Sequence, residues 1–121
     1  MKRVVWMPLV LAVMLLSWGC EDDDDFYDHR PPGGNGSLVV DNNTSDDFDL
    51  FVDGVRVSEV KDGRERIFDY PPGVYRVVLD PEDGFDSFRE DVDILEGRLT
   101  ILHVDADFSF PGDFRVFVEV D

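Results

Sequence analysis

The stretch DFDLFVDGVRV, residues 47–57, alternates apolar and acidic side chains up to an Asp-Gly pair at 53–54. Phe48, Leu50 and Val52 share one face of an extended chain. Side chains of a β-strand alternate between its two faces, so this spacing predicts a strand with one buried side. An Asp-Gly pair between two such runs favours a tight hairpin turn. The stretch therefore predicts a β-hairpin that packs one face against a core.

The same period of two continues on both sides of this hairpin. Short alternating segments follow one another, separated by turn residues roughly every eight to twelve positions. The expected strands cover 37–41, 47–52, 55–57, 64–70, 74–80, 87–95, 98–105 and 113–121. Helical periodicity is confined to the first residues of the chain. We therefore expect an all-β domain over 37–121, a small antiparallel β-sandwich of about seven or eight strands.

Several of these segments are similar to the PEGA-like domains of bacterial envelope proteins. The similarity rests on GSLVVDN at 36–42, DLFVDGVRV at 49–57, PPGVYRVVLD at 71–80, and EGR followed by LTILHVD at 96–105. The resemblance implies an Ig-like β-fold that serves as a non-catalytic module at the cell envelope. It supplies no catalytic residues. The last expected strand lies outside the pattern and is either an eighth sandwich strand or an edge offered to a partner.

Residues 1–19 have the organisation of a secretory signal peptide. A basic start at Lys2 and Arg3 precedes a run of 13 mostly apolar residues, Val4 to Leu16. That run is shorter than the roughly 20 residues that a membrane-spanning helix requires. Gly19 and Cys20 then resemble the cleavage site of bacterial lipoproteins. The resemblance implies that the leader is removed before Cys20 and that lipid is attached to this residue.

Cys20 is the only cysteine, so no intrachain disulfide can form. The three acyl chains of a mature lipoprotein exceed the two signals that stable membrane anchoring requires. We therefore expect a protein of the bacterial cell envelope that is anchored to a membrane through Cys20. The alternative is an ordinary secreted protein in which Cys20 is incidental or is removed with the leader.

Residues 20–36 have the composition of a disordered linker. Five consecutive acids, Glu21 to Asp25, repel one another. The following stretch, Phe26 to Gly36, contains two prolines and three glycines, which neither a helix nor a strand accommodates. The segment predicts a solvated tether with a reach of about 20 to 25 Å. Acidic residues after a lipidated cysteine also resemble sorting signals of bacterial lipoproteins, and the two roles are compatible.

The charge of the chain restricts its partners. The sequence has 28 acidic and 11 basic residues, a formal net charge of −17. Such a surface repels nucleic-acid phosphates and anionic lipid headgroups, so we expect no nucleic-acid partner. It favours divalent cations and basic proteins. We expect the partners to be the membrane, through the lipid, and another envelope protein.

Few residues are suited to catalysis. His29 lies in the expected linker, and His103 is the only histidine of the expected domain. His103 shares a strand face with Leu99 and Ile101, which predicts a partly buried, hydrogen-bonded imidazole rather than a catalytic base. The sequence has no zinc-ligand spacing and no phosphate-binding glycine loop. We expect no enzyme activity and no catalytic residues.

Acid-rich loops leave calcium as the alternative, because this ion prefers several oxygen ligands. The EF-hand-like spacing that starts at Asp41 fails, since Asp46 and Val52 replace the required Gly and Glu. The loop at 80–86 offers a second set of candidate ligands, namely Asp80, Glu82, Asp83 and Asp86. The alternative function is a calcium-stabilised adhesion or glycan-binding domain on the same anchor. Converging loop carboxylates would favour it, whereas splayed ones would favour the interaction module.

Four aromatic residues fall on strand faces opposite the best apolar stripes. They are Phe51, Phe68, Tyr70 and Phe117. They either join the core through a bulge or a change of register, or form an exposed patch that contacts a partner or a glycan.

Overall fold

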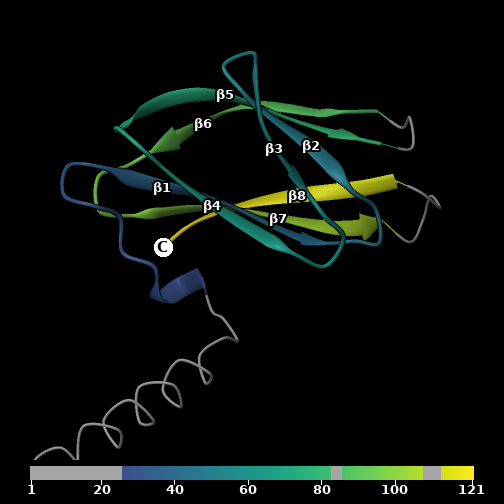
Figure 1. The fold of residues 1–121 in the computed structure, drawn as a ribbon, viewed down its shortest axis with the longest axis horizontal. Coiled ribbons are helices and arrows are strands. Elements are labelled where there is room, and N and C mark those ends of the chain that lie inside the picture. The colour runs from purple at the N-terminus through teal and green to yellow at the C-terminus, as the bar shows by residue number, and fades with distance from the viewer. Residues whose placement is uncertain (1–25, 83–85, 108–112) are drawn as a thin grey trace, which may run out of the picture.

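The computed structural model describes residues 26–82, 86–107 and 113–121. Eight strands form two four-stranded sheets that pack face to face (Figure 1). Sheet A contains, in spatial order, β4 (Glu65–Tyr70), β1 (Gly36–Asn43), β7 (Leu99–Asp107) and β8 (Asp113–Val120). Sheet B contains β3 (Val55–Val60), β2 (Phe48–Val52), β5 (Gly73–Pro81) and β6 (Phe88–Ile94). The predicted all-β sandwich is confirmed.

One apolar core lies between the two sheets and takes alternate residues from the strands. Its buried members are Leu38, Val40, Phe48, Leu50, Val52, Val60, Val77, Leu79, Val92, Ile94, Leu102 and Val104. Phe48 of β2 meets Phe114 of β8 edge to face, with 4.8 Å between the ring centroids. Such aromatic contacts add to the burial of apolar area. The core therefore connects the hairpin that predicted the fold to the last strand of the chain.

The central pair of sheet A runs parallel, which differs from the wholly antiparallel arrangement predicted. Ser37 of β1 lies opposite Leu99 of β7, and Asn43 lies opposite Asp105. The other ladders are antiparallel. Parallel neighbours require a long connection, and here β2 to β6 separate the two strands in sequence. Side-chain alternation reports which face is buried but not the direction of the neighbour.

The turn chemistry is confirmed at the β2–β3 hairpin and differs from the expectation at the Pro-Pro-Gly stretch. Asp53 and Gly54 have φ angles of 51° and 85°, the left-handed conformations that a tight hairpin requires. A register shift between Leu50 and Phe51 forms a bulge in this hairpin. The sharp reversal at 71–73 joins no hairpin, because it leads from β4 in sheet A to β5 in sheet B.

A second, smaller apolar cluster covers the outer face of sheet A. Val39, Leu99 and Ile101 point away from the main core and are nevertheless buried. Phe26 and Ile67 pack on them. The ring of Phe26 therefore shields a face of sheet A that would otherwise expose apolar side chains to water.

Part of the predicted linker is folded against the sandwich. Phe26–Asp28 forms one turn of 3-10 helix, and Gly36 is the buried first residue of β1. A Cβ at Gly36 would collide with the backbone carbonyl of Leu95. The prediction of a free tether is corrected for residues 26–36. The composition of a segment does not show whether one of its aromatic rings packs on a sheet, as Phe26 does here. The predicted signal peptide and Cys20 lie outside the described residues.

Within the described ranges, no helix combines the length and apolar character needed to cross a bilayer.

Candidate functional site

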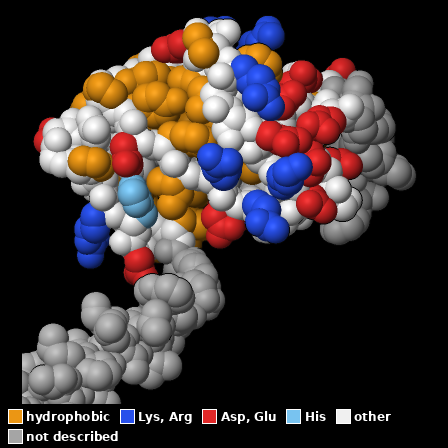
Figure 2. Space-filling model, viewed as in Figure 1, with side chains coloured by type: hydrophobic (Ala, Val, Ile, Leu, Met, Phe, Trp, Pro, Cys, Tyr) orange, Lys and Arg blue, Asp and Glu red, His pale blue; other side chains and the backbone are white. Residues whose placement is uncertain are grey.

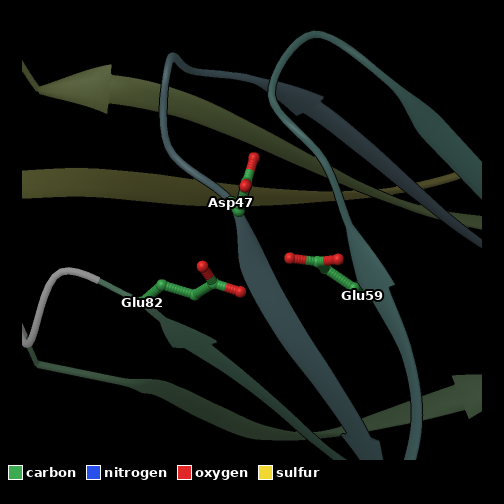
Figure 3. Close-up of side chains that lie close together, drawn as sticks. All are labelled: Asp47, Glu59 and Glu82. Atoms are coloured by element: carbon green, nitrogen blue, oxygen red, sulfur yellow. The ribbon is translucent and has the colours of Figure 1, made fainter.

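Three carboxylates converge at one end of sheet B. Asp47 directly precedes β2, Glu59 belongs to β3, and Glu82 follows β5. One oxygen of each side chain lies within 4.8 Å of oxygens of the other two. In Figure 3 the side chains of Glu59 and Glu82 extend toward each other, and the carboxyl group of Asp47 lies above them. Asp47 and Glu59 are half-buried, and Glu82 is exposed. We call these three residues the carboxylate cluster.

Asn42 organises the loop that leads into the carboxylate cluster. Its side chain is fully buried. The side-chain nitrogen lies 2.8, 3.2 and 3.1 Å from the backbone carbonyl oxygens of Asp46, Val60 and Lys61. Its oxygen accepts hydrogen bonds from the backbone N–H and the hydroxyl of Thr44. One buried amide therefore fixes the end of β1, the loop before β2 and the end of β3 relative to one another.

Like charge dominates the electrostatics of the carboxylate cluster. A hydrogen bond with Glu59, together with burial and the negative charge of Glu59 and Asp47, raises the pKa of Glu82. Lys61 lies beside the cluster, with its Nζ 3.3 Å from an oxygen of Glu59. Such a group can share a proton between two carboxyls or supply oxygen ligands to a hard cation.

Of the three predicted loop acids that the structure describes, one belongs to the carboxylate cluster. That residue is Glu82, whereas Asp80 accepts a hydrogen bond of 2.9 Å from the hydroxyl of Ser87. Asp86 is exposed, and the predicted ligand Asp83 lies outside the described residues. The carboxylates that do converge come from three strand ends rather than from one loop.

Sequence reasoning did not identify Asp47 and Glu59 as neighbours of Glu82. They meet because β2 pairs with both β3 and β5. The hairpin turn predicts the first of these pairings, which brings Asp47 and Glu59 to the same end. The second pairing leaves no signal in the local spacing.

A second polar group lies on the outer face of sheet A, around His103 of β7. Its Nδ1 is 3.2 Å from Oδ2 of Asp41 on β1, and its Nε2 is 2.6 Å from Oε1 of Glu119 on β8. The side chain is 24% exposed. The prediction of a partly buried, hydrogen-bonded imidazole is confirmed. We call these three residues the histidine bridge, because they connect three neighbouring strands.

The histidine bridge favours its charged form. Burial alone would lower the pKa of His103, but the hydrogen bonds with Glu119 and Asp41 outweigh this effect, and the pKa is raised. Hydrogen bonds from His103 and Tyr27 lower the pKa of Glu119. The two shifts have one cause, since each partner stabilises the charge of the other.

The chain before β1 is held on sheet A by polar contacts as well as by Phe26. The hydroxyl of Tyr27 donates a hydrogen bond of 3.0 Å to Glu119. The Nε2 of His29 lies 2.8 Å from Oδ1 of Asp69 on β4. A hydrogen bond from Ser37, together with His29, lowers the pKa of Asp69. We call residues 26–29 the docked segment.

The four aromatic residues singled out in the sequence do not form one patch. Phe68 and Tyr70 pack against the main core. Phe51 follows the bulge and lines a shallow hollow of about 300 Å³ on sheet B. Phe117 is 51% exposed on β8 of sheet A. The first alternative, membership of the core, is confirmed for two of the four.

Strand β8 forms an edge of sheet A and exposes apolar side chains. Phe117, Val118 and Val120 are 51%, 47% and 43% exposed. Phe114 and Val116, at the other end of the strand, pack against the core. Figure 2, which has the same view as Figure 1, shows apolar side chains gathered on one half of the visible face and charged side chains on the other half.

Comparison with known proteins identifies a structural neighbour but no related sequence. No family model matches this sequence, and no curated protein sequence matches it. Among solved structures, the chain is similar to the N-terminal domain of AlgF from P. aeruginosa, with 19% identity and a TM-score of 0.48. The match covers 73% of this chain and 96% of that domain. The two four-stranded sheets by themselves define a small all-β sandwich protein, and the resemblance to PEGA-like domains stays a prediction.

Proposed function

We propose that the protein is a bacterial envelope lipoprotein, anchored to a membrane by lipid on Cys20, whose sandwich is a non-catalytic structural or protein-interaction module. The observation that carries the proposal is the docked segment. Phe26 packs on the outer face of sheet A, and Tyr27 and His29 are hydrogen-bonded to it. The chain that enters the domain from the anchor is thereby fixed to one face of the sandwich.

The position of the docked segment sets how far the domain can lie from the anchor. Only Glu21 to Asp25 separate Cys20 from Phe26. A chain spans at most about 3.5 Å per residue, so the steps from Cys20 to Phe26 reach roughly 20 Å. Had the linker been free up to Gly36, the upper limit would have been more than twice as long. The docked segment therefore keeps the outer face of sheet A close to the membrane.

Two further observations support the non-catalytic and interaction parts of the proposal. Both ring nitrogens of His103 are engaged by carboxylates, which suits a structural role better than that of a catalytic base. The exposed apolar residues of β8 offer an edge to another protein. The net charge of −17 supports a partner other than nucleic acid.

Fractionation of cells that express Cys20→Ala tests the anchor. The wild-type protein should lie in the membrane fraction, with a mass that has lost residues 1–19 and gained lipid. Cys20→Ala should be released or should keep its leader. Ser17→Ala is the matched control, because it changes the same stretch and keeps the thiol. An unchanged mass and an unchanged membrane fraction for Cys20→Ala would contradict the proposal.

The carboxylate cluster favours the alternative function, a calcium-stabilised adhesion or glycan-binding domain on the same anchor. Three carboxylates from three strand ends converge there, as ligands of a hard cation do. Calcium that binds the folded state raises the melting temperature by mass action, whereas sodium chloride of matched ionic strength only screens charge.

The alternative is tested by melting the full chain in the two salts. A calcium-specific rise that Glu82→Gln abolishes and Asp86→Asn retains would support it, because Asp86 is an exposed loop acid outside the carboxylate cluster. Equal effects of the two salts would exclude calcium binding at this site.

A further inference from the structure

We propose that the free edge of β8 is a homodimer interface, in which β8 pairs antiparallel with β8 of a second copy about a two-fold axis at Phe117. This inference rests on the interaction role proposed above and gives that role a partner. It does not depend on the lipid anchor, which is measured separately through Cys20→Ala.

The backbone of β8 has a free side with a defined set of donors and acceptors. Leu99 of β7 and Asp121 exchange N–H···O bonds of 3.0 and 2.8 Å, so the odd-numbered residues of β8 bond to β7. In an antiparallel ladder the alternate residues direct their N–H and C=O groups to the other side. These residues are Phe114, Val116, Val118 and Val120. In the described part of the chain, no strand pairs with that side.

Antiparallel pairing of β8 with β8 of a second copy, side by side, satisfies these backbone groups. When Phe117 lies opposite Phe117 of the second copy, Val116 lies opposite Val118 and Phe114 lies opposite Val120. Each of these opposed pairs consists of residues whose backbone groups face the free edge. A slip by one residue would oppose them to residues already bonded to β7 and would turn the side chains to the wrong faces.

Charge selects this register over the neighbouring ones. The register with Phe117 at the two-fold axis places Arg115 opposite Glu119 of the second copy, and symmetry repeats the pair. Arg115 is exposed, with its guanidinium 5.4 Å from the ring centroid of Phe117. A shift by two residues would lose this pair and shorten the ladder. In one direction Phe117 would lie opposite Glu119, and in the other Asp113 would lie opposite Glu119. The unfavourable contact in the proposed register, Asp113 opposite Asp121, falls at the two ends.

The same pairing covers the apolar side chains that the single copy exposes. Phe117, Val118 and Val120 are each more than 40% exposed in one copy. In the dimer, Phe117 contacts Phe117 of the second copy near the two-fold axis. The two copies of sheet A join into one continuous eight-stranded sheet, and Val118 and Val120 extend its inner face. The net charge of −17 opposes association, so added salt should strengthen the dimer.

A cysteine at the two-fold axis tests the register directly. In a non-hydrogen-bonded antiparallel pair, opposed Cα atoms lie about 4.5 Å apart, within the range that a disulfide spans. Full-length Phe117→Cys in a Cys20→Ser background, in non-ionic detergent, should form a disulfide-linked dimer rapidly. Val74→Cys is the matched control, because Val74 is 63% exposed but lies on β5 of the other sheet. Equal cross-linking rates for the two thiols would overturn the proposal.

Charge reversal gives a second test that does not rely on cross-linking. Arg115→Glu and Glu119→Arg should each sediment as monomers, because each sets like charges opposite one another. Glu119→Arg also removes the hydrogen bonds of Glu119 with His103 and Tyr27, so the mixture of the two variants decides the test. An equimolar mixture should form a heterodimer, since it restores both opposite-charge pairs. Circular dichroism and melting of each variant distinguish lost pairing from failed folding. A wild-type protein that stays monomeric at millimolar concentration in high salt, or a mixture that stays monomeric, would overturn the proposal.

Discussion

At the histidine bridge two carboxylates flank an imidazole, whereas in the carboxylate cluster three carboxylates lie together with one lysine beside them. The pKa of Glu119 in the first region is lowered, chiefly by its hydrogen bond with His103. The pKa of Glu82 in the second region is raised, chiefly by its hydrogen bond with Glu59. The same chemical group therefore has opposite electrostatic consequences at two places on one sandwich.

This difference shows that a net charge of −17 is not a uniform property of the surface. At the histidine bridge, the two acids favour the protonated form of the imidazole between them, and the hydrogen bonds connect three neighbouring strands. At the carboxylate cluster, the neighbouring acids disfavour the ionised form of Glu82. The two regions should therefore respond differently to substitution and to pH.

We expect the largest effect on stability from removing the buried side-chain amide of Asn42, which fixes the loop leading into the carboxylate cluster. Asn42→Ala would leave three backbone carbonyls without their side-chain donor, so we expect a loss of about 2–4 kcal/mol in the free energy of unfolding. Asn43→Ala is the control, because the neighbouring amide is exposed, and should change stability by less than about 0.5 kcal/mol. Urea unfolding measures both. Equal losses would show that the buried hydrogen bonds of Asn42 do not hold the loop.

The docked segment at the histidine-bridge end should give the next largest effect. Phe26→Ala removes a partly buried ring from the cover of Val39, Leu99 and Ile101, at a cost of about 1–2 kcal/mol. Asp28→Ala, an exposed position in the same turn, should be nearly neutral. Thermal melting of the two variants compares them. Identical melting temperatures would mean that the ring does not contribute to the fold.

Glu82→Gln should stabilise the protein, in contrast to the substitutions near the histidine bridge. The raised pKa of Glu82 means that folding disfavours its ionised form, and this cost grows as pH rises through the folded pKa. The variant should melt higher than the wild type at pH 7 and equally at pH 4 or below. Glu96→Gln, in an exposed turn, serves as the control. A lower melting temperature at pH 7 would indicate that Glu82 makes a favourable contact instead.

His103→Gln should produce the smallest effect and one with the pH dependence of a histidine. The raised pKa of His103 means that its stabilising contribution is complete below the unfolded value, near 6.5, and is lost as pH rises through the folded pKa. The variant should be less stable than the wild type near pH 6 and about equal to it at pH 9. A stability difference that is the same at both pH values would point to packing rather than to charge.

The strands could be predicted from the sequence because each one carries its own evidence. The alternation in 47–57 and the Asp-Gly turn identify β2 and β3, and similar local signals identify the other strands. The parallel pairing of β1 with β7 and the crossing at 71–73 could not be predicted in this way. They depend on which strands become neighbours after the chain has folded, and residue spacing within a strand carries no record of that choice.

The candidate sites were predictable to a smaller extent. His103 was recognised because its strand face also carries Leu99 and Ile101, and Glu82 because it lies in an acid-rich loop. Asp47 and Glu59 join Glu82 only through strand pairing. Phe26 lies among prolines, glycines and charged residues, so the local composition hides its contact with sheet A.

We infer above all that the docked segment packs on the sandwich and, in the proposed lipoprotein, holds sheet A close to the membrane. Nuclear Overhauser effects between the ring protons of Phe26 and the methyl groups of Val39 and Ile101 test it most directly. In the full chain in detergent micelles, we expect clear cross-peaks and ring-current shifts of these methyl resonances. Random-coil shifts for Phe26 without such cross-peaks would contradict it, because residues 20–36 would then be a free tether.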